Sequence, residues 1–246
     1  MGRIADSTIK GFMYQFNRTL NEILSSTNEV ITVEGIVEDI DKVSDEHITA
    51  TQCKYHGEVE QFQWSKVHKP ILQMLKTYTE QKDLHIIFIL YAFFPSEKAG
   101  EKKVTKDEIY KALNTKNIEY ICDYIAYIKK IEDIEIRELI SKTRKSKSDK
   151  EKIKKYIDTN ELEVLCDLDE FIDNRFQFII GQEYYRLEKE NKEMLKEEGF
   201  ASEDIEEIIF PNAINCIASI SILKNDKDRN ITKQELINEL KTIKRT

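Results

Sequence analysis

Two neighbouring segments, Val30-Ile-Thr-Val-Glu-Gly-Ile-Val-Glu-Asp-Ile-Asp41 and Ile48-Thr-Ala-Thr-Gln-Cys-Lys-Tyr55, decide how this chain folds. Both are rich in β-branched residues and predict strands over residues 29–37 and 47–55. An acidic turn at Asp41–Glu46 separates them. Because strands so close in the sequence favour an antiparallel hairpin, we expect these two to pair with each other.

Polar side chains lie in the middle of the second strand. Alternate side chains of a strand share a face, so Gln52 and Lys54 point the same way. An amide and a lysine at such positions are costly to bury without polar partners. The candidate partners are the carboxylates of the first strand and the turn: Glu34, Glu38, Asp39 and Asp41. Converging carboxylates and an amide oxygen would suit Mg²⁺, and the lysine would stabilise negative charge on a phosphate. The alternative is a structural ion pair between Asp39 and Lys54.

Helices and one further strand flank this hairpin. Apolar residues recur at helical spacing over 8–25, and a second amphipathic helix is expected from about Lys69 to Tyr78. The continuous apolar run Leu84–Phe93 is typical of a strand buried on both faces. Residues 8–95 therefore read as helix, strand, strand, helix, strand. A helix before the last strand implies at least one parallel pairing.

The sequence after about residue 105 is predicted to be helical. Capping-box patterns begin at Thr105 and Thr232, and one of the expected helices covers 161–178. We therefore predict a first domain over residues 1–100 and an all-helical region over 101–246, which would act as a DNA clamp, an assembly part or a partner-binding part.

A basic stretch interrupts this helical region. Lys142–Lys155 carries eight basic and two acidic side chains and almost no apolar residue. Its cations, with Arg144, Lys145 and Lys147 as the candidates, would contact DNA phosphates. The alternative is a solvated linker or helix face.

Composition excludes several classes of protein. The 246 residues are 40% hydrophobic, with only 7 Gly and 3 Pro, which favours a helix-rich globular fold. The longest apolar run is too short to cross a bilayer and the start lacks a signal peptide, so we expect a cytoplasmic protein without a membrane partner. The four cysteines show no Cys-x-x-Cys pair, which disfavours a zinc or dithiol site. A net charge of −8 argues only mildly against nucleic acid, because a local patch decides such binding.

The segment around the hairpin resembles a nuclease family. Asp39, a gap of twelve residues and then Gln52-Cys53-Lys54 are similar to the PD-(D/E)xK motif, in its variant with Gln in place of the second acid. Gly11-Phe-Met-Tyr-Gln15 and Glu38-Asp-Ile-Asp41 narrow the resemblance to nuclease effector domains of bacterial anti-phage systems of the CBASS, Lamassu and AVAST type. The resemblance implies an α/β fold with a restriction-endonuclease-like α-β-β-α-β core and a mixed sheet.

The resemblance also implies roles for particular residues. Asp39 and Gln52 would bind Mg²⁺ or Mn²⁺, with Glu34 as a further candidate ligand. Lys54 would be the catalytic lysine, and Gln15 would be the polar residue that the first helix adds to the site. The sequence departs from the motif in two ways, because Glu38 stands where the motif has Pro and Gln52 carries no charge. Lower metal affinity than in relatives with Glu is therefore expected.

The expected function is a metal-dependent endonuclease that hydrolyses phosphodiester bonds in double-stranded DNA as an anti-phage effector. The chain lacks a P-loop, so its restraint would come from assembly with a partner protein or from a further domain missing from this chain. The expected partners are DNA and either a homo-oligomer or partner defence subunits. The alternative is a catalytically degenerate nuclease-fold module that binds DNA or partner subunits.

Overall fold

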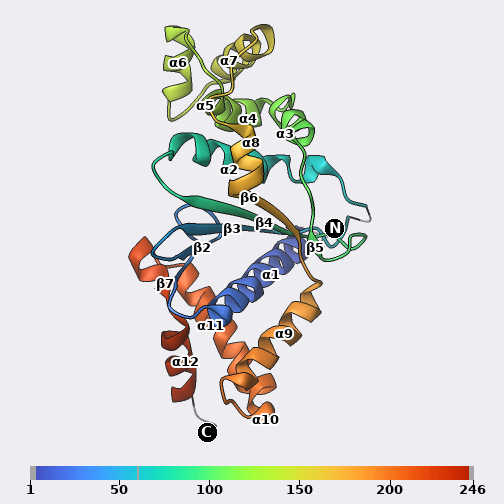
Figure 1. The fold of residues 1–246 in the computed structure, drawn as a ribbon, viewed down its shortest axis with the longest axis vertical. Coiled ribbons are helices and arrows are strands. Elements are labelled where there is room, and N and C mark those ends of the chain that lie inside the picture. The colour runs from blue at the N-terminus through green and yellow to red at the C-terminus, as the bar shows by residue number, and fades with distance from the viewer. Residues whose placement is uncertain (1–3, 60, 244–246) are drawn as a thin grey trace. The chain divides into compact units, whose positions relative to one another are not determined.

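The computed structural model describes residues 4–59 and 61–243, and its elements are drawn in Figure 1. It is an α/β fold built on a seven-stranded mixed sheet with the order β5-β6-β4-β3-β2-β1-β7. The strands are β1 (Val30–Val33), β2 (Ile40–Val43), β3 (Ile48–Tyr55), β4 (Ile86–Phe93), β5 (Gly100–Glu101), β6 (Phe176–Ile180) and β7 (Asn230–Ile231).

The chain divides into two compact units. Unit 1 comprises the described residues of Met1–Phe62, His85–Lys102 and Gln177–Thr246. It holds nearly the whole sheet, with α1 (Ile4–Ser25), α9 (Tyr184–Glu197), α10 (Ser202–Asp204), a π-helical turn (Ile205–Ile209), α11 (Phe210–Ser221), a 3-10 turn (Asp226–Arg229) and α12 (Lys233–Thr242).

Unit 2 comprises Gln63–Leu84 and Lys103–Phe176 and is helical. Its elements are a 3-10 turn (Trp64–Lys66), α2 (His68–Glu80), α3 (Lys106–Leu113), α4 (Ile118–Tyr120), a π-helical turn (Ile121–Ile125), α5 (Ala126–Ile128), α6 (Ile134–Ser141), α7 (Lys147–Thr159), α8 (Leu168–Glu170) and a second π-helical turn (Phe171–Arg175). This division differs from the expected boundary at residue 100, because the chain enters unit 2 twice and returns to unit 1 each time.

The centre of the sheet follows the sequence pattern closely. β3 pairs with β4 in parallel along all eight residues, which confirms the predicted parallel pairing. The predicted two-stranded hairpin is wrong in detail, because part of the expected acidic turn is the strand β2, which pairs antiparallel with both β1 and β3. Asp41 can be buried in that strand because backbone N–H groups satisfy its carboxylate.

The prediction that residues 101–246 are all helical is wrong. Phe176, Phe178 and Ile180 are buried and alternate with less buried neighbours, which is the period of a strand, so β6 replaces the end of the helix expected over 161–178. β5 pairs with β6, and β7 pairs with β1 across about two hundred residues of sequence. Such long-range pairings leave no local signal in the sequence.

One glycine holds α1 against the sheet. A Cβ atom at Gly181 would lie 2.1 Å from the hydroxyl oxygen of Tyr14 and 2.6 Å from the ring of Tyr91, so only glycine fits this close approach. The Tyr14 hydroxyl donates to the carbonyl of Gln182, whose N–H donates to the Tyr91 hydroxyl. These bonds fix the link from β6 to α9 and hold the polar residues of α1 at the sheet.

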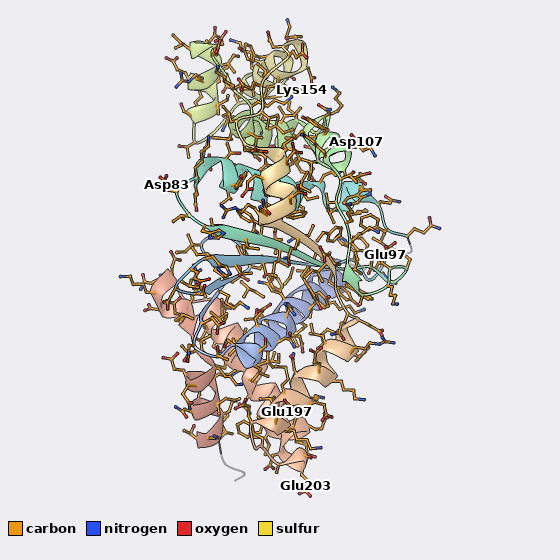
Figure 2. All side chains as sticks on the ribbon, viewed as in Figure 1. Asp83, Glu97, Asp107, Lys154, Glu197 and Glu203 are labelled. Carbon is orange, nitrogen blue, oxygen red and sulfur yellow. The ribbon has the colours of Figure 1, made fainter. Side chains whose placement is uncertain are left out.

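Helix ends and surface charges complete the fold. Thr105 caps α3, and Thr232 forms a full capping box with Glu235, as the sequence predicts. Figure 2 shows exposed side chains such as Asp83, Asp107 and Glu203 projecting away from the ribbon. Within the described part of the chain, no helix is both long enough and apolar enough to cross a membrane.

Candidate active site

The site begins where α1 meets the end of β1. Gln15 is 8% exposed, and its side-chain nitrogen donates to the carboxylate of Glu34 at 2.6 Å. Glu34 follows β1 directly and has φ +50°, the only positive φ outside glycine among the described residues. This left-handed conformation is uncommon for a residue with a side chain and is a feature of functional turns. Two residues that the sequence predicts for the site are therefore in direct contact.

Asp41 organises the turn that carries the acids. Its carboxylate accepts the N–H groups of Val37 and Glu38 at 2.8 and 3.1 Å. A Cβ atom at Gly35 would lie 2.3 Å from the Cγ atom of Asp41, so glycine is required there. The oxygens of Asp41 are thus engaged with backbone, which makes Asp41 a positioning residue for the turn that contains Asp39.

Asp39 meets the predicted residues of β3. One of its carboxylate oxygens accepts the N–H of Cys53 at 2.8 Å. Hydrogen bonding from the Gln52 side chain and the charge of Lys54 both act on the same carboxylate. Gln52 is 4% exposed, whereas Lys54 is half-buried. Asp39, Gln52 and Lys54 therefore come together, as their spacing predicts.

Lys54 is close to these acids without a fixed partner. Among the ion pairs of the described residues, none involves Lys54. Its charge nevertheless lowers the pKa of both Asp39 and Glu34. The alternative drawn from the sequence, a structural Asp39–Lys54 ion pair, accordingly lacks its expected contact in this structure.

Burial raises the pKa values of the carboxylates, and the charge of Asp39 adds to this effect on Glu34 and Glu38. Burial is the main cause that raises the pKa of Asp39, and it also raises that of Glu34, to which the charge of Asp39 adds. Burial and the charge of Asp39 raise the pKa of Glu38 to about 8. Three acids with raised pKa values share one lysine, so the site carries more negative than positive groups.

The oxygen atoms at the site are of the kind that binds a hard divalent cation. Mg²⁺ and Mn²⁺ prefer carboxylate and amide oxygens, which Asp39, Glu34 and Gln52 provide. A cation would also favour the charged form of these acids, whose pKa values burial raises. Among residues 4–59 and 61–243, no three His, Cys, Asp or Glu side chains are arranged as a metal-binding group. The predicted ligand set includes an amide, which lies outside those residue types.

Two further charged residues reach the site. The sequence predicts Glu38 as a partner of Lys54. Its position next to Asp39 in the motif also indicates a place at the site. Arg229 lies in the 3-10 turn before β7, where its charge lowers the pKa of Glu34. No local sequence pattern could have indicated Arg229, since it comes from the far end of the chain.

The predicted DNA-contacting residues are in the other unit. Arg144 and Lys145 lie in the loop before α7 and Lys147 begins that helix, all in unit 2, whereas the acids belong to unit 1. Carboxylates already partner several cations of the stretch: Lys142 with Asp149 at 3.0 Å, Lys147 with Glu151 at 4.0 Å, Lys150 with Glu119 at 2.5 Å and Lys152 with Glu135 at 3.0 Å. Much of its positive charge is therefore compensated within the chain.

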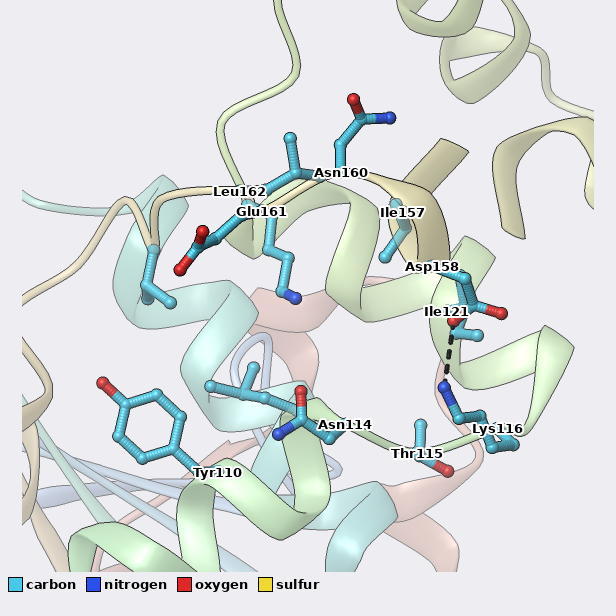
Figure 3. Close-up of a pocket in the computed structure, with 13 residues that line it drawn as sticks. Tyr110, Asn114, Thr115, Lys116, Ile121, Ile157, Asp158, Asn160, Glu161 and Leu162 are labelled. Carbon is cyan, nitrogen blue, oxygen red and sulfur yellow. Dashed lines mark hydrogen bonds and ion pairs between the residues drawn. The ribbon is translucent and has the colours of Figure 1, made fainter. Parts of the chain in front are cut away.

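Unit 2 also contains a pocket of about 380 Å³, drawn in Figure 3. Lys116 and Asp158 pair there at 3.3 Å, and Lys129 also lines it. The helices α3 and α7 end at this pocket, so cations are favoured there by the exposed helix carbonyls. This pocket holds none of the residues that the sequence predicts for the site.

Comparison with known proteins adds no identification. No protein-family model, no curated protein and no solved structure matches this chain.

Proposed function

We propose that this protein is a metal-dependent nuclease that hydrolyses phosphodiester bonds in DNA. One observation carries the proposal: side chains from α1, from the turn after β1 and from β3 meet at one place. They are Gln15, Glu34, Asp39, Gln52 and Lys54. The resemblance to the PD-(D/E)xK motif supports the same reading, because these are the residues that the motif assigns.

Each side chain has a role that follows from its chemistry. Asp39, Gln52 and Glu34 would hold Mg²⁺ or Mn²⁺, which would supply a Lewis acid and lower the pKa of water. The ammonium of Lys54 stabilises the charge that develops on the phosphate, since no ion pair among the described residues competes for it. Gln15 orients Glu34 by its hydrogen bond and is a positioning residue.

The setting of the activity is also part of the proposal. The resemblance favours an anti-phage effector in the cytoplasm that acts on double-stranded DNA. A nuclease free in a cell would damage the host genome. We therefore propose that a homo-oligomer or partner defence subunits restrain it.

Plasmid cleavage tests the proposal directly. Supercoiled plasmid is incubated with the full chain at high and low protein concentration, with Mg²⁺, with Mn²⁺ or with EDTA. We expect nicking or linearisation with metal, none with EDTA and none with Asp39→Ala. Cleavage that persists in EDTA or in Asp39→Ala would contradict the assignment.

A second candidate is a nuclease-fold module that binds nucleic acid or partner subunits without catalysis. It is favoured by the uncharged Gln52 and by the hydrogen bonds that already occupy Asp39. Titration calorimetry with Mn²⁺ separates the two candidates. Binding that is lost in Asp39→Ala supports the nuclease, whereas no binding by either protein favours the module.

A further inference from the structure

A groove of about 710 Å³ lies in unit 1, beside the α1 residues of the candidate site. Side chains of α1, of the end of β4 and of the start of α9 line it, together with the loop that follows β4. Arg18 from α1 is one of these residues, and it comes one helical turn after Gln15. The groove and the candidate site therefore share α1.

Cations with unused hydrogen-bonding capacity line this groove. Arg18 stacks on the Tyr91 ring at 4.4 Å and is already paired with Glu22, while its buried Nε atom has no hydrogen-bond partner among the described residues. Lys98 and Arg186 are exposed, and neither is in an ion pair within the described part of the chain. An anion in the groove would supply the acceptors that these groups lack.

The acids of the groove do not cancel these cations. Glu97 is held by Lys102 at 2.7 Å, so its charge is already compensated. Glu183 remains as a single exposed carboxylate opposite Lys98 and Arg186. The groove thus differs from Lys142–Lys155, where neighbouring carboxylates partner several of the cations.

Aromatic side chains accompany the cations. Tyr91 and Phe93 line the groove, and Tyr185, next to Arg186, is 73% exposed. An exposed tyrosine beside unpaired cations suits a polyanion whose bases are free to stack. In a duplex the base faces are already stacked, so a single strand fits these side chains better. The volume of the groove lies in the range of small-ligand sites in proteins. It is large enough for a short run of nucleotides.

We propose that this groove binds a single strand of nucleic acid and leads it along α1 to the candidate active site. Lys98 and Arg186 contact phosphates, and Tyr185 stacks on a base. The inference rests on the proposed function, and it assigns a single strand as the form of the substrate in place of the double-stranded DNA that the resemblance favours.

Binding is measured by fluorescence anisotropy in EDTA, so that it does not depend on cleavage. The probes are labelled oligothymidylate, oligouridylate and a DNA hairpin with the same number of nucleotides. The full chain is compared with Lys98→Ala/Arg186→Ala, with Tyr185→Ala and with Arg144→Ala/Lys145→Ala/Lys147→Ala as the matched basic control. Each is titrated over a series of salt concentrations.

We expect the wild-type chain to bind at least one single-stranded probe more tightly than the hairpin. Loss of two phosphate contacts should lower the salt slope by about 1.4, since each contact to a single strand contributes about 0.7. Tyr185→Ala should weaken binding about 5-fold or more and leave the slope unchanged, because stacking is uncharged. The control should change affinity less than the groove variant. Tighter binding of oligothymidylate would identify the bound strand as DNA, and tighter binding of oligouridylate would identify it as RNA.

Two results would overturn the groove assignment: equal affinity and slope in Lys98→Ala/Arg186→Ala, or tighter binding of the hairpin with no effect of Tyr185→Ala. Failure of the proposed function looks different. Strand binding that depends on the groove, with no cleavage in Mn²⁺, would keep the groove and reject the nuclease. Metal-dependent cleavage that the groove variants leave unchanged would keep the nuclease and reject the groove.

Discussion

The two units differ sharply in where they keep their polar groups. Unit 2 buries one polar side chain among the described residues, Thr79, which bonds to the carbonyl one turn earlier in its helix. Unit 1 buries many, including Gln15, Asn17, Asn21, Glu22, Glu38, Asp41, Gln52 and Asn191. Burial of polar groups costs free energy unless they are hydrogen-bonded. Such a concentration is expected where groups are held for chemistry.

The same contrast appears in the charges. Unit 2 places lysines and carboxylates on its surface in exposed pairs, which contribute little to stability. Unit 1 holds acids with raised pKa values close to Lys54, and Lys98 and Arg186 of its groove are in no ion pair among the described residues. The density of basic residues in the sequence therefore indicates unit 2, whereas the acids with raised pKa values beside Lys54 lie in unit 1.

The largest expected effect is on catalysis in unit 1. Lys54→Ala should lower the cleavage rate on the order of 10²–10³-fold, because it removes a group that stabilises the transition state. Asp39→Ala should be at least as severe. Single-turnover cleavage in Mn²⁺ measures both, with exposed Lys111→Ala of unit 2 as control. A large fall in melting temperature with cleavage retained in Lys54→Ala would instead make Lys54 a structural residue.

Alanine substitutions at two separate glycines, Gly181 and Gly11, test the packing that holds α1 to the sheet. Gly181→Ala should destabilise the protein by about 1–3 kcal/mol, because the new methyl group overlaps Tyr14 and Tyr91. Gly11→Ala is the matched control, since nothing lies within 4 Å of its Cβ position inside α1. That change should stabilise by about 0.5–1 kcal/mol. Urea unfolding measures both, and equal effects would show that α1 is not packed as described.

The pH dependence of protein stability tests the effect of burying Glu38 beside the other acids. Its pKa of about 8 lies above the usual value of 4.5, so the folded state binds more protons than the unfolded state between these values. The stabilisation is fully present below pH 4.5 and is lost as pH rises through 8. Glu38→Gln should therefore make stability less dependent on pH between 5 and 8 and raise it at pH 8, by urea unfolding without metal.

Glu29 supplies the control for this pH measurement. Hydrogen bonds from the backbone of Thr27 and neighbouring residues lower its pKa to about 2, so its stabilisation is present above pH 4.5 and is lost as pH falls through 2. Glu29→Gln should not alter the pH dependence between 5 and 8. A change of slope in that variant equal to the change in Glu38→Gln would show that the effect is not specific to the site.

The smallest effect is expected from the basic stretch of unit 2. Arg144→Ala/Lys145→Ala/Lys147→Ala should weaken DNA binding uniformly across sequences and flatten its salt dependence, because phosphate contacts carry no sequence information. Lys147 already pairs with Glu151, so we expect a smaller loss than in the groove variant. An unchanged salt slope would assign the stretch to the solvated linker.

The sequence by itself was sufficient for the centre of unit 1. Strand alternation predicts that Gln52 and Lys54 share a face, and the carboxylates that precede them in the sequence, Asp39 among them, are their predicted partners. The helical stripe predicts α1, which carries Gln15 to Glu34. These parts are encoded locally, because the period of apolar residues and the spacing of a hairpin act over a few residues.

Tertiary structure decided the rest. Whether Phe176–Ile180 forms a helix or a strand depends on a free sheet edge supplied by distant residues, and the approach of Arg229 to Glu34 depends on β7 pairing with β1. The groove likewise needs Arg18 and Arg186, which lie far apart in the sequence, to line one surface. Burial and charge compensation are properties of the packed chain, so a count of lysines cannot show which of them lack a partner.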